Sequence, residues 1–149
     1  RKELYITGHS LGGALAILFG THLDNTGTYT FGCPRVLGKG GNALTKGPVF
    51  RIEELHDIVT RIPLPPVFEH VGDSYFIDND QNFFKNPSLW KRTRERLGDG
   101  ELTIAWNLVK LFVLKEAGMA VLQYLHGHSP YNYSVYCWNN IVRNEYVRR

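Results

Sequence analysis

The sequence predicts an α/β fold whose sheet is mostly parallel, and three observations support this prediction. The 149 residues are 43% hydrophobic and 21% charged, a composition that is typical of one globular domain. Short β-branched and aromatic runs flank a helical pattern near the N-terminus. Residues 8–12 read GHSLG and join the first apolar run to that helical pattern. A strand, a helix and a second strand at this spacing indicate a βαβ unit, in which the strands are parallel.

The individual elements follow from periodicity and from the positions of proline and glycine. Short apolar or alternating runs predict strands over residues 4–7, 28–32, 49–53 and 74–78. Helical patterns predict helices over residues 10–24, 87–97 and 101–125. The IPLPP run over 62–66 cannot form a central strand, because proline lacks the backbone donor that a ladder needs.

Composition limits the classes of partner. Lys+Arg minus Asp+Glu is 17 − 14 = +3, too small an excess to indicate a nucleic-acid partner. The two cysteines, Cys33 and Cys137, cannot form a disulfide framework and lack metal-ligand spacing, so no metal site is expected. The chain starts at Arg1 without a signal segment, so any targeting signal is expected upstream and the compartment stays open.

The GHSLG turn has the form of a nucleophile elbow. In this G-x-S-x-G pattern a tight turn from strand to helix holds a serine, here Ser10, in a strained conformation. We expect Gly8 and Gly12 to remove β-carbons that would clash where strand and helix approach. The Leu11 N–H would then point toward a developing oxyanion. The simpler alternative is a glycine-containing helix start with Ser10 as the N-cap.

Five motifs in a fixed order resemble one family. GHSLGGALA, TFGCPR, HDIVTRIP, EHVGDSYFID and HSPYNY are similar to the C-terminal half of the class 3 lipases, fungal-type members of the α/β-hydrolase superfamily. The resemblance runs from Leu4 to Tyr133, except over residues 81–127. It implies a partial α/β-hydrolase fold that starts at the elbow strand, with an added long helix before the catalytic histidine. Residues 1–149 would then be the C-terminal portion of a single domain whose upstream part, with the lid and a second oxyanion donor, is missing.

The same resemblance assigns the acid. Serine hydrolases of this fold place Ser, then Asp or Glu, then His along the chain, an order that Ser10, Asp57 and His128 satisfy. Asp57 follows an apolar run, at a strand's expected carboxyl end, and matches the family's DIVxRxP motif. The competing carboxylates are expected on the surface or in turns; they are Asp73, Asp78 and Asp80.

The base is expected among six histidines. His128 begins a match to the family's H-S-x-x-x-Y motif, whose histidine is the base, and His126 is the alternative. The His9 ring is expected to point away from the serine. The other histidines are expected to be packed, exposed or structural, and they are His22, His56 and His70. We expect Cys33 to be a small buried residue near a strand end.

The resemblance implies a serine hydrolase that cleaves carboxylic esters of lipids, an acylglycerol lipase that works through an acyl-enzyme without a cofactor. The alternatives are a non-catalytic lipid-binding or scaffolding relative, or an acyltransferase of the same fold. A lipid ester is the expected partner, and a peripheral membrane or lipid-droplet surface is a further candidate. The helix over 101–125 is interrupted by Lys110, Lys115 and Glu116, which favours core packing, a cap or an interfacial surface over a membrane span. The basic residues 91–96 are expected on a solvated face or against anionic lipid.

Overall fold

The structure is a computed structural model that describes residues 2–63, 65–97 and 126–147. The predicted helix over 101–125 lies outside the described residues. The strands are β1 (Tyr5–His9), β2 (Gly27–Phe31), β3 (Val49–Glu54), β4 (Asp73–Ile77) and β5 (Phe83–Lys85). The helices are α1 (Leu11–Gly20), α2 (Leu89–Leu97) and α5 (Pro130–Val147), with short 3₁₀ turns η1 (Gly41–Leu44) and η2 (Val59–Arg61).

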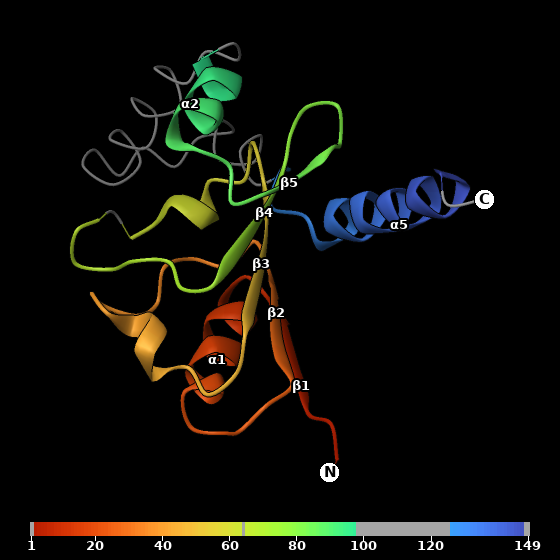
Figure 1. Ribbon diagram of the computed structural model, residues 1–149. Helices are drawn as coiled ribbons and strands as arrows, with labels where there is room; N and C mark the ends of the chain where they lie inside the picture. The colour runs from red at the N-terminus through yellow and green to blue at the C-terminus, as the bar shows by residue number, and fades with distance from the viewer. Residues whose placement is uncertain (1, 64, 98–125, 148–149) are drawn as a thin grey trace.

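The five strands form one sheet in the order β1-β2-β3-β4-β5 (Figure 1). The strands β1 to β4 are parallel to their neighbours, and β5 runs antiparallel to β4. The predicted α/β class with a mostly parallel sheet is therefore confirmed. The four predicted strands are present with ends shifted by at most two residues. The strand β5 was not predicted, because its three residues are too short for a periodic pattern.

The helices differ from the prediction at their ends. The helix α1 ends at Gly20 rather than at residue 24, because the chain turns there: the Thr21 N–H donates to the Leu18 carbonyl. The helix α2 begins at Leu89, two residues later than predicted, since the Ser88 hydroxyl accepts the Lys91 N–H as an N-cap does. In the described part of the chain, no helix combines the length and apolar character that crossing a membrane requires.

The helix α5 had no counterpart in the sequence analysis. It begins at Pro130, where the missing backbone donor costs nothing, and the Ser129 carbonyl accepts the Tyr133 N–H of its first turn. In Figure 1, α1 and α5 lie on opposite sides of the sheet. The helix α1 therefore covers one face near β1 and β2, and α5 starts on the other face beside β3 and β4.

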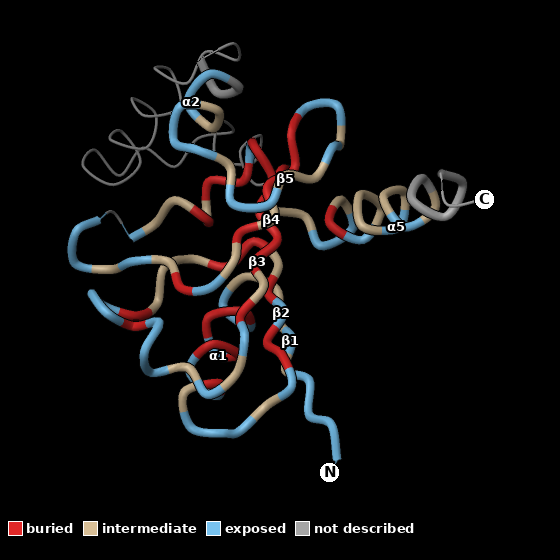
Figure 2. The backbone as a smooth tube through the Cα atoms, viewed as in Figure 1, coloured by how far each residue is buried: buried red, intermediate tan, exposed pale blue. Residues whose placement is uncertain are grey.

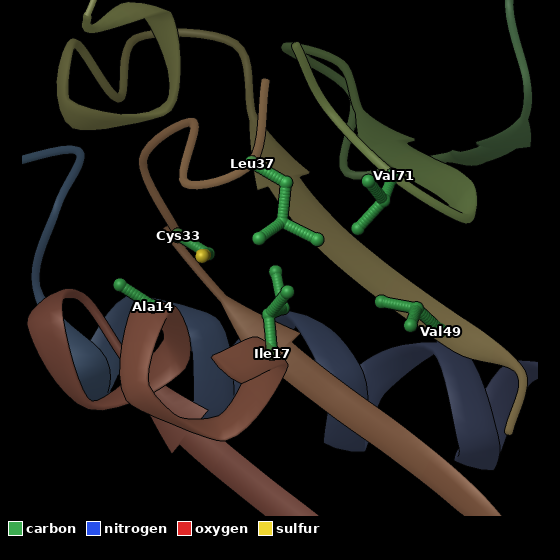
Figure 3. Packing of buried hydrophobic residues seen from close by; sticks show 6 residues of the cluster. All are labelled: Ala14, Ile17, Cys33, Leu37, Val49 and Val71. Carbon is green, nitrogen blue, oxygen red and sulfur yellow. The ribbon is translucent and has the colours of Figure 1, made fainter. Parts of the chain in front are cut away.

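Each face of the sheet carries its own apolar core. The core on the α1 side joins the helix to β3 and to the loops beyond β2 and before β4 (Figure 3); it contains Ala14, Ile17, Cys33, Leu37, Val49 and Val71. The core on the α5 side is built on Ile52, Ile77 and Tyr133. Figure 2 shows burial in the central strands and along α1, and only a short buried stretch at the start of α5. Apolar contacts therefore hold α1 along its length, and hold α5 through Tyr133 with its neighbours Tyr136 and Cys137.

A buried ionic cluster attaches α2 to the sheet. The Glu53 carboxylate on β3 is 3% exposed and lies next to the guanidinium groups of Arg51 and Arg92. The Arg92 Nη1 is 2.8 Å from Glu53 Oε2, and its Nη2 donates to the Ser74 hydroxyl at 2.5 Å. The expectation that the basic residues 91–96 form a solvated face is therefore wrong for Arg92, which points back to the sheet. The paired guanidinium groups lower the pKa of Glu53 to about 2 although burial opposes this.

Candidate active site

Ser10 occupies a strained turn between β1 and α1. Its φ of 56° and ψ of −127° lie in a region that L-residues with side chains rarely adopt. The turn is held because the Ser10 N–H donates to the Phe31 carbonyl of β2 at 2.9 Å. The hydroxyl makes no capping hydrogen bond to α1, which argues against the simple N-cap alternative. Leu11 is the first residue of α1, so its N–H is one of the donors that have no acceptor within the helix.

Only one of the two elbow glycines is required by crowding. A β-carbon on Gly8 would lie 2.2 Å from the Gly12 carbonyl oxygen, so strand and helix meet too closely for any side chain there. A β-carbon on Gly12 would meet nothing within 4 Å. The expectation that Gly12 relieves a clash is therefore wrong. Gly13 is the second crowded position, because a β-carbon there would lie 3.0 Å from the Cys33 β-carbon.

We predict opposite effects of alanine at these two glycines. Gly8→Ala forces the backbone of the elbow apart and should lower the free energy of unfolding of the full-length protein by roughly 3 kcal/mol or more. Gly12→Ala removes a flexible residue from a helix and should raise it by about 0.5–1 kcal/mol. Chemical denaturation of both variants measures the difference. Equal stabilities of the two variants would contradict the crowding at Gly8.

The structure brings together Ser10 from the end of β1, Asp57 from just beyond β3 and His128 from the loop before α5. The His128 Nε2 is 2.7 Å from the Ser10 hydroxyl oxygen, although 118 residues separate the two. The His128 Nδ1 is 2.9 Å from Asp57 Oδ2 and 3.0 Å from Oδ1. With the proton on Nδ1 donated to the carboxylate, Nε2 is free to accept the serine proton. His126, the alternative, is exposed, and its backbone carbonyl and ring contact Asn132 instead.

The Asp57 carboxylate is fully buried but well supplied with hydrogen bonds. It lies just beyond β3, where the Val59 N–H of η2 donates to Oδ1 at 2.8 Å. The Tyr133 hydroxyl of α5 donates to Oδ2 at 2.6 Å, in addition to the His128 bond. Three donors compensate the loss of water around this charge, as a buried carboxylate requires.

Two residues next to Asp57 belong to motifs in the sequence, but the sequence analysis assigned neither of them a role. Tyr133 is 2% exposed, and its hydroxyl, which donates to Asp57, also accepts the Glu54 N–H of β3 at 3.1 Å. Gly32 ends the TFG motif with a φ of +58°, and a β-carbon there would lie 2.6 Å from Asp57 Oδ2. The tyrosine of H-S-x-x-x-Y and the glycine after β2 were the available signals. The sequence shows the residue types but not the contacts.

The His9 ring does not point away from the site, contrary to the expectation. Its Nε2 is 2.8 Å from the His128 carbonyl oxygen, and the centroids of the two rings are 4.6 Å apart. The ring also meets the Tyr133 ring edge-on at 5.9 Å. His9 therefore contacts the segment that carries the imidazole of the site, which the sequence analysis missed because the two lie 119 residues apart.

The remaining candidates lie elsewhere. Asp73 is paired with Lys85 at 2.8 Å, and Asp78 accepts the N–H groups of Asp80 and Asn82 in a turn, as expected of surface and turn carboxylates. Burial lowers the pKa of His70 to about 4 and raises that of Cys33 to about 12, which fits packed, unreactive residues. His22 and His56 are exposed. Among residues 2–63, 65–97 and 126–147, no cluster of His, Cys, Asp and Glu could hold a metal ion.

We predict that Tyr133→Phe lowers the free energy of unfolding while the site stays assembled. The substitution keeps the ring in the α5-side core and deletes the hydroxyl that donates to Asp57. Since hydrogen bonds to charged groups contribute about 1.5–3 kcal/mol, the free energy of unfolding should fall by roughly 2 kcal/mol. Thermal and urea unfolding of the full-length protein measure this. Tyr131→Phe, at a residue 72% exposed, is the matched control, and equal stabilities of the two variants would contradict the prediction.

Glu54 adds a second buried carboxyl group close to Asp57. It is 6% exposed, and its Oε2 accepts the His56 N–H at 2.7 Å. Burial raises the pKa of Glu54 to about 7 from an ordinary 4.5, with the Asp57 charge adding to the rise. The folded chain therefore holds this proton more tightly than the unfolded chain. Stability contributed by Glu54 is present below about pH 4.5 and is lost as the pH rises through about 7.

We predict that Glu54→Gln abolishes the loss of stability at high pH. The glutamine oxygen can keep the bond to the His56 N–H but carries no charge. At pH 8 the variant should be more stable than the wild type by on the order of 2 kcal/mol, with the difference shrinking toward pH 5. Urea unfolding of the full-length protein at both pH values measures it. Glu69→Gln, at an exposed residue, controls for the general effect of charge removal, and parallel pH profiles for wild type and Glu54→Gln would refute the prediction.

The fold and the site together define a class of protein. A strained serine follows the first parallel strand, β1. A buried carboxylate just beyond β3 and an imidazole from the loop before α5 meet at this serine. This is the architecture of an α/β-hydrolase. Residues 1–67 match the model of the family described as Lipase (class 3). The chain belongs to the class 3 lipase family, and the resemblance found in the sequence is thereby confirmed.

The chain is similar to named lipases from plants and fungi. A triacylglycerol lipase of Nicotiana tabacum is 32% identical over 165 residues, which cover 94% of this chain and 26% of that protein. One from Arabidopsis thaliana is 40% identical over 130 residues, covering 70% and 25%. The solved lipase from Rhizopus microsporus var. chinensis is 34% identical, with a TM-score of 0.45, over 50% of this chain and 31% of that one. The chain thus spans about a quarter of the length of the curated relatives it matches.

Proposed function

We propose that the protein is a serine hydrolase that cleaves the carboxylic esters of lipids, with acylglycerols as substrates. One observation carries the proposal: a single imidazole, that of His128, lies 2.7 Å from the hydroxyl of an elbow serine and 2.9 Å from a buried carboxylate. The names of the plant relatives, which are triacylglycerol lipases, support the substrate class. Residues 1–149 would supply the nucleophile, the acid and the base of one hydrolase domain.

In the proposed reaction, the Ser10 oxygen attacks the ester carbonyl carbon while its proton passes to His128 Nε2. The Asp57 carboxylate stabilises the imidazolium that forms, and the Leu11 N–H donates to the oxyanion of the tetrahedral intermediate. Collapse of the intermediate breaks the ester C–O bond, and the departing alkoxide takes the proton from His128. This leaves an acyl group on Ser10.

The acyl-enzyme is then cleared by water. His128 Nε2 accepts a proton from the water as its oxygen attacks the acyl carbon, and a second tetrahedral intermediate forms. Its collapse returns the proton to the Ser10 oxygen and releases a fatty acid. All proton transfers pass through one nitrogen, and the proposed cycle uses no metal or organic cofactor.

A fluorophosphonate probe on the full-length protein tests the proposal, because such probes form a covalent bond only with activated serines. We expect stoichiometric labelling, mapped by peptide mass spectrometry to Ser10, together with fatty acid release from a triacylglycerol emulsion. Binding of the emulsion without labelling or release would overturn the proposal in favour of a non-catalytic lipid-binding protein. Labelling followed by transfer of the acyl group to an added alcohol rather than to water would replace hydrolysis with acyl transfer.

A further inference from the structure

His9 contacts the segment around the proposed base at two points. Its Nε2 lies 2.8 Å from the backbone carbonyl oxygen of His128, and its ring is tilted by 34° against the His128 ring at 4.6 Å. Because a carbonyl oxygen only accepts, Nε2 of His9 carries the proton and donates it. The same residue is covalently joined to Ser10. The nucleophile's strand is thus connected directly to the backbone of the residue that must accept the nucleophile's proton.

The backbone of the same segment is also packed from its other side. A β-carbon on Gly127 would lie 2.7 Å from Glu54 Oε2 and 2.8 Å from the His56 carbonyl carbon. Gly127 is buried, so this part of the chain is held against the end of β3 while His9 holds the next residue from β1. The position of the His128 ring is therefore set by contacts with its backbone and its face, in addition to its bond to Asp57.

We propose that His9 is a positioning residue for the His128 imidazole: its Nε2–H fixes the His128 carbonyl, and its ring limits rotation of the His128 ring. The inference rests on the proposed function, since it gives His9 a task in proton transfer from Ser10. Correct placement of a general base within about 3 Å of the proton it accepts is what makes the transfer efficient. A base that is free to rotate spends less time within that distance.

The two contacts can be separated by substitution in the full-length protein. His9→Phe keeps a ring and loses the donor, His9→Gln keeps an amide donor and loses the ring, and His9→Ala loses both. His22→Ala, at an exposed histidine beyond the end of α1, is the control. We expect His9→Ala to lower kcat and the rate of fluorophosphonate labelling by roughly 10- to 100-fold, with KM changed less than about threefold. His9→Gln should retain more activity than His9→Phe.

A measurement on the resting protein separates this inference from the proposed function. We expect the proton between His128 Nδ1 and Asp57 to give a low-field NMR signal, which His9→Ala should broaden or shift and His22→Ala should leave unchanged. An unchanged signal in His9→Ala overturns the inference, whatever the activity. A changed signal in a protein whose wild type is never labelled keeps the inference and overturns the proposed function. If His9→Ala does not fold, wild-type signals in both His9→Gln and His9→Phe overturn the inference, and a shifted signal with a lowered rate in either variant supports it.

Discussion

Replacement of Ser10 with alanine in the full-length protein is expected to lower kcat for ester hydrolysis by on the order of 10⁵-fold or more. At about 1.4 kcal/mol per factor of ten, this corresponds to roughly 7 kcal/mol of activation free energy. The reason is chemical: alanine has no oxygen, so no acyl-enzyme can form. Fatty acid release from an emulsion, and the covalent probe, both report the loss.

The same variant should fold at least as well as the wild type. Ser10 is held at a φ of 56°, and its hydroxyl makes no capping bond to α1. Removal of the hydroxyl should therefore have little effect on the stability of α1. Thermal unfolding separates a chemical loss from a structural one. Ser134→Ala is the matched control, because Ser134 is exposed and its hydroxyl bonds within α5 to the Tyr131 carbonyl. Comparable activities for Ser10→Ala and wild type would remove the serine from the mechanism.

His128→Ala is expected to lower kcat by a similar factor, on the order of 10⁵, whereas His126→Ala should stay within about threefold of the wild type. His128 alone of the two places a ring nitrogen 2.7 Å from the Ser10 hydroxyl oxygen. Without that nitrogen the serine proton has no acceptor, and the hydroxyl remains a weak nucleophile. The rate of fluorophosphonate labelling measures the effect on the first chemical step.

Comparing the two histidine variants is more informative than measuring either variant alone, because the residues lie two positions apart on the same loop. A loss that reflects disruption of the loop would appear in both, and thermal unfolding would show it. An inactive His126→Ala beside an active His128→Ala would reverse the assignment of the base. In the proposed mechanism Ser10 and His128 act in one step, so the double variant should be no worse than either single one.

Much of the fold follows from local patterns in the sequence. The four parallel strands are marked by apolar or alternating runs, and the elbow is marked by GHSLG. The end of α1 and the start of α2 were missed by two to four residues, because a backbone turn at Thr21 and a serine cap at Ser88 decide them. The strand β5 exists only by pairing with β4, which is a tertiary interaction that three residues cannot encode.

The site is less accessible from local patterns. The acid and the base were selected by chain order and family motifs, because 71 residues separate Asp57 from His128 and no local rule connects them. Contacts made by folding were misjudged: His9 was expected to turn away, and Gly12 was expected to be crowded. Gly32 and Tyr133 were visible as residue types, but their roles depend on what lies beside them in space.

The donors around Asp57 link the docking of α5 to the assembly of the site. Two of the three groups that donate to this carboxylate, His128 Nδ1 and the Tyr133 hydroxyl, come from α5 and the loop before it, and only the Val59 N–H comes from nearby in the chain. Detachment of α5 would therefore leave the Asp57 carboxylate without two of its donors and, at the same time, take the proposed base away from Ser10. Incomplete assembly therefore has an electrostatic cost: a chain with a folded sheet but an undocked α5 is destabilised by the poorly compensated Asp57 charge and lacks an imidazole beside Ser10.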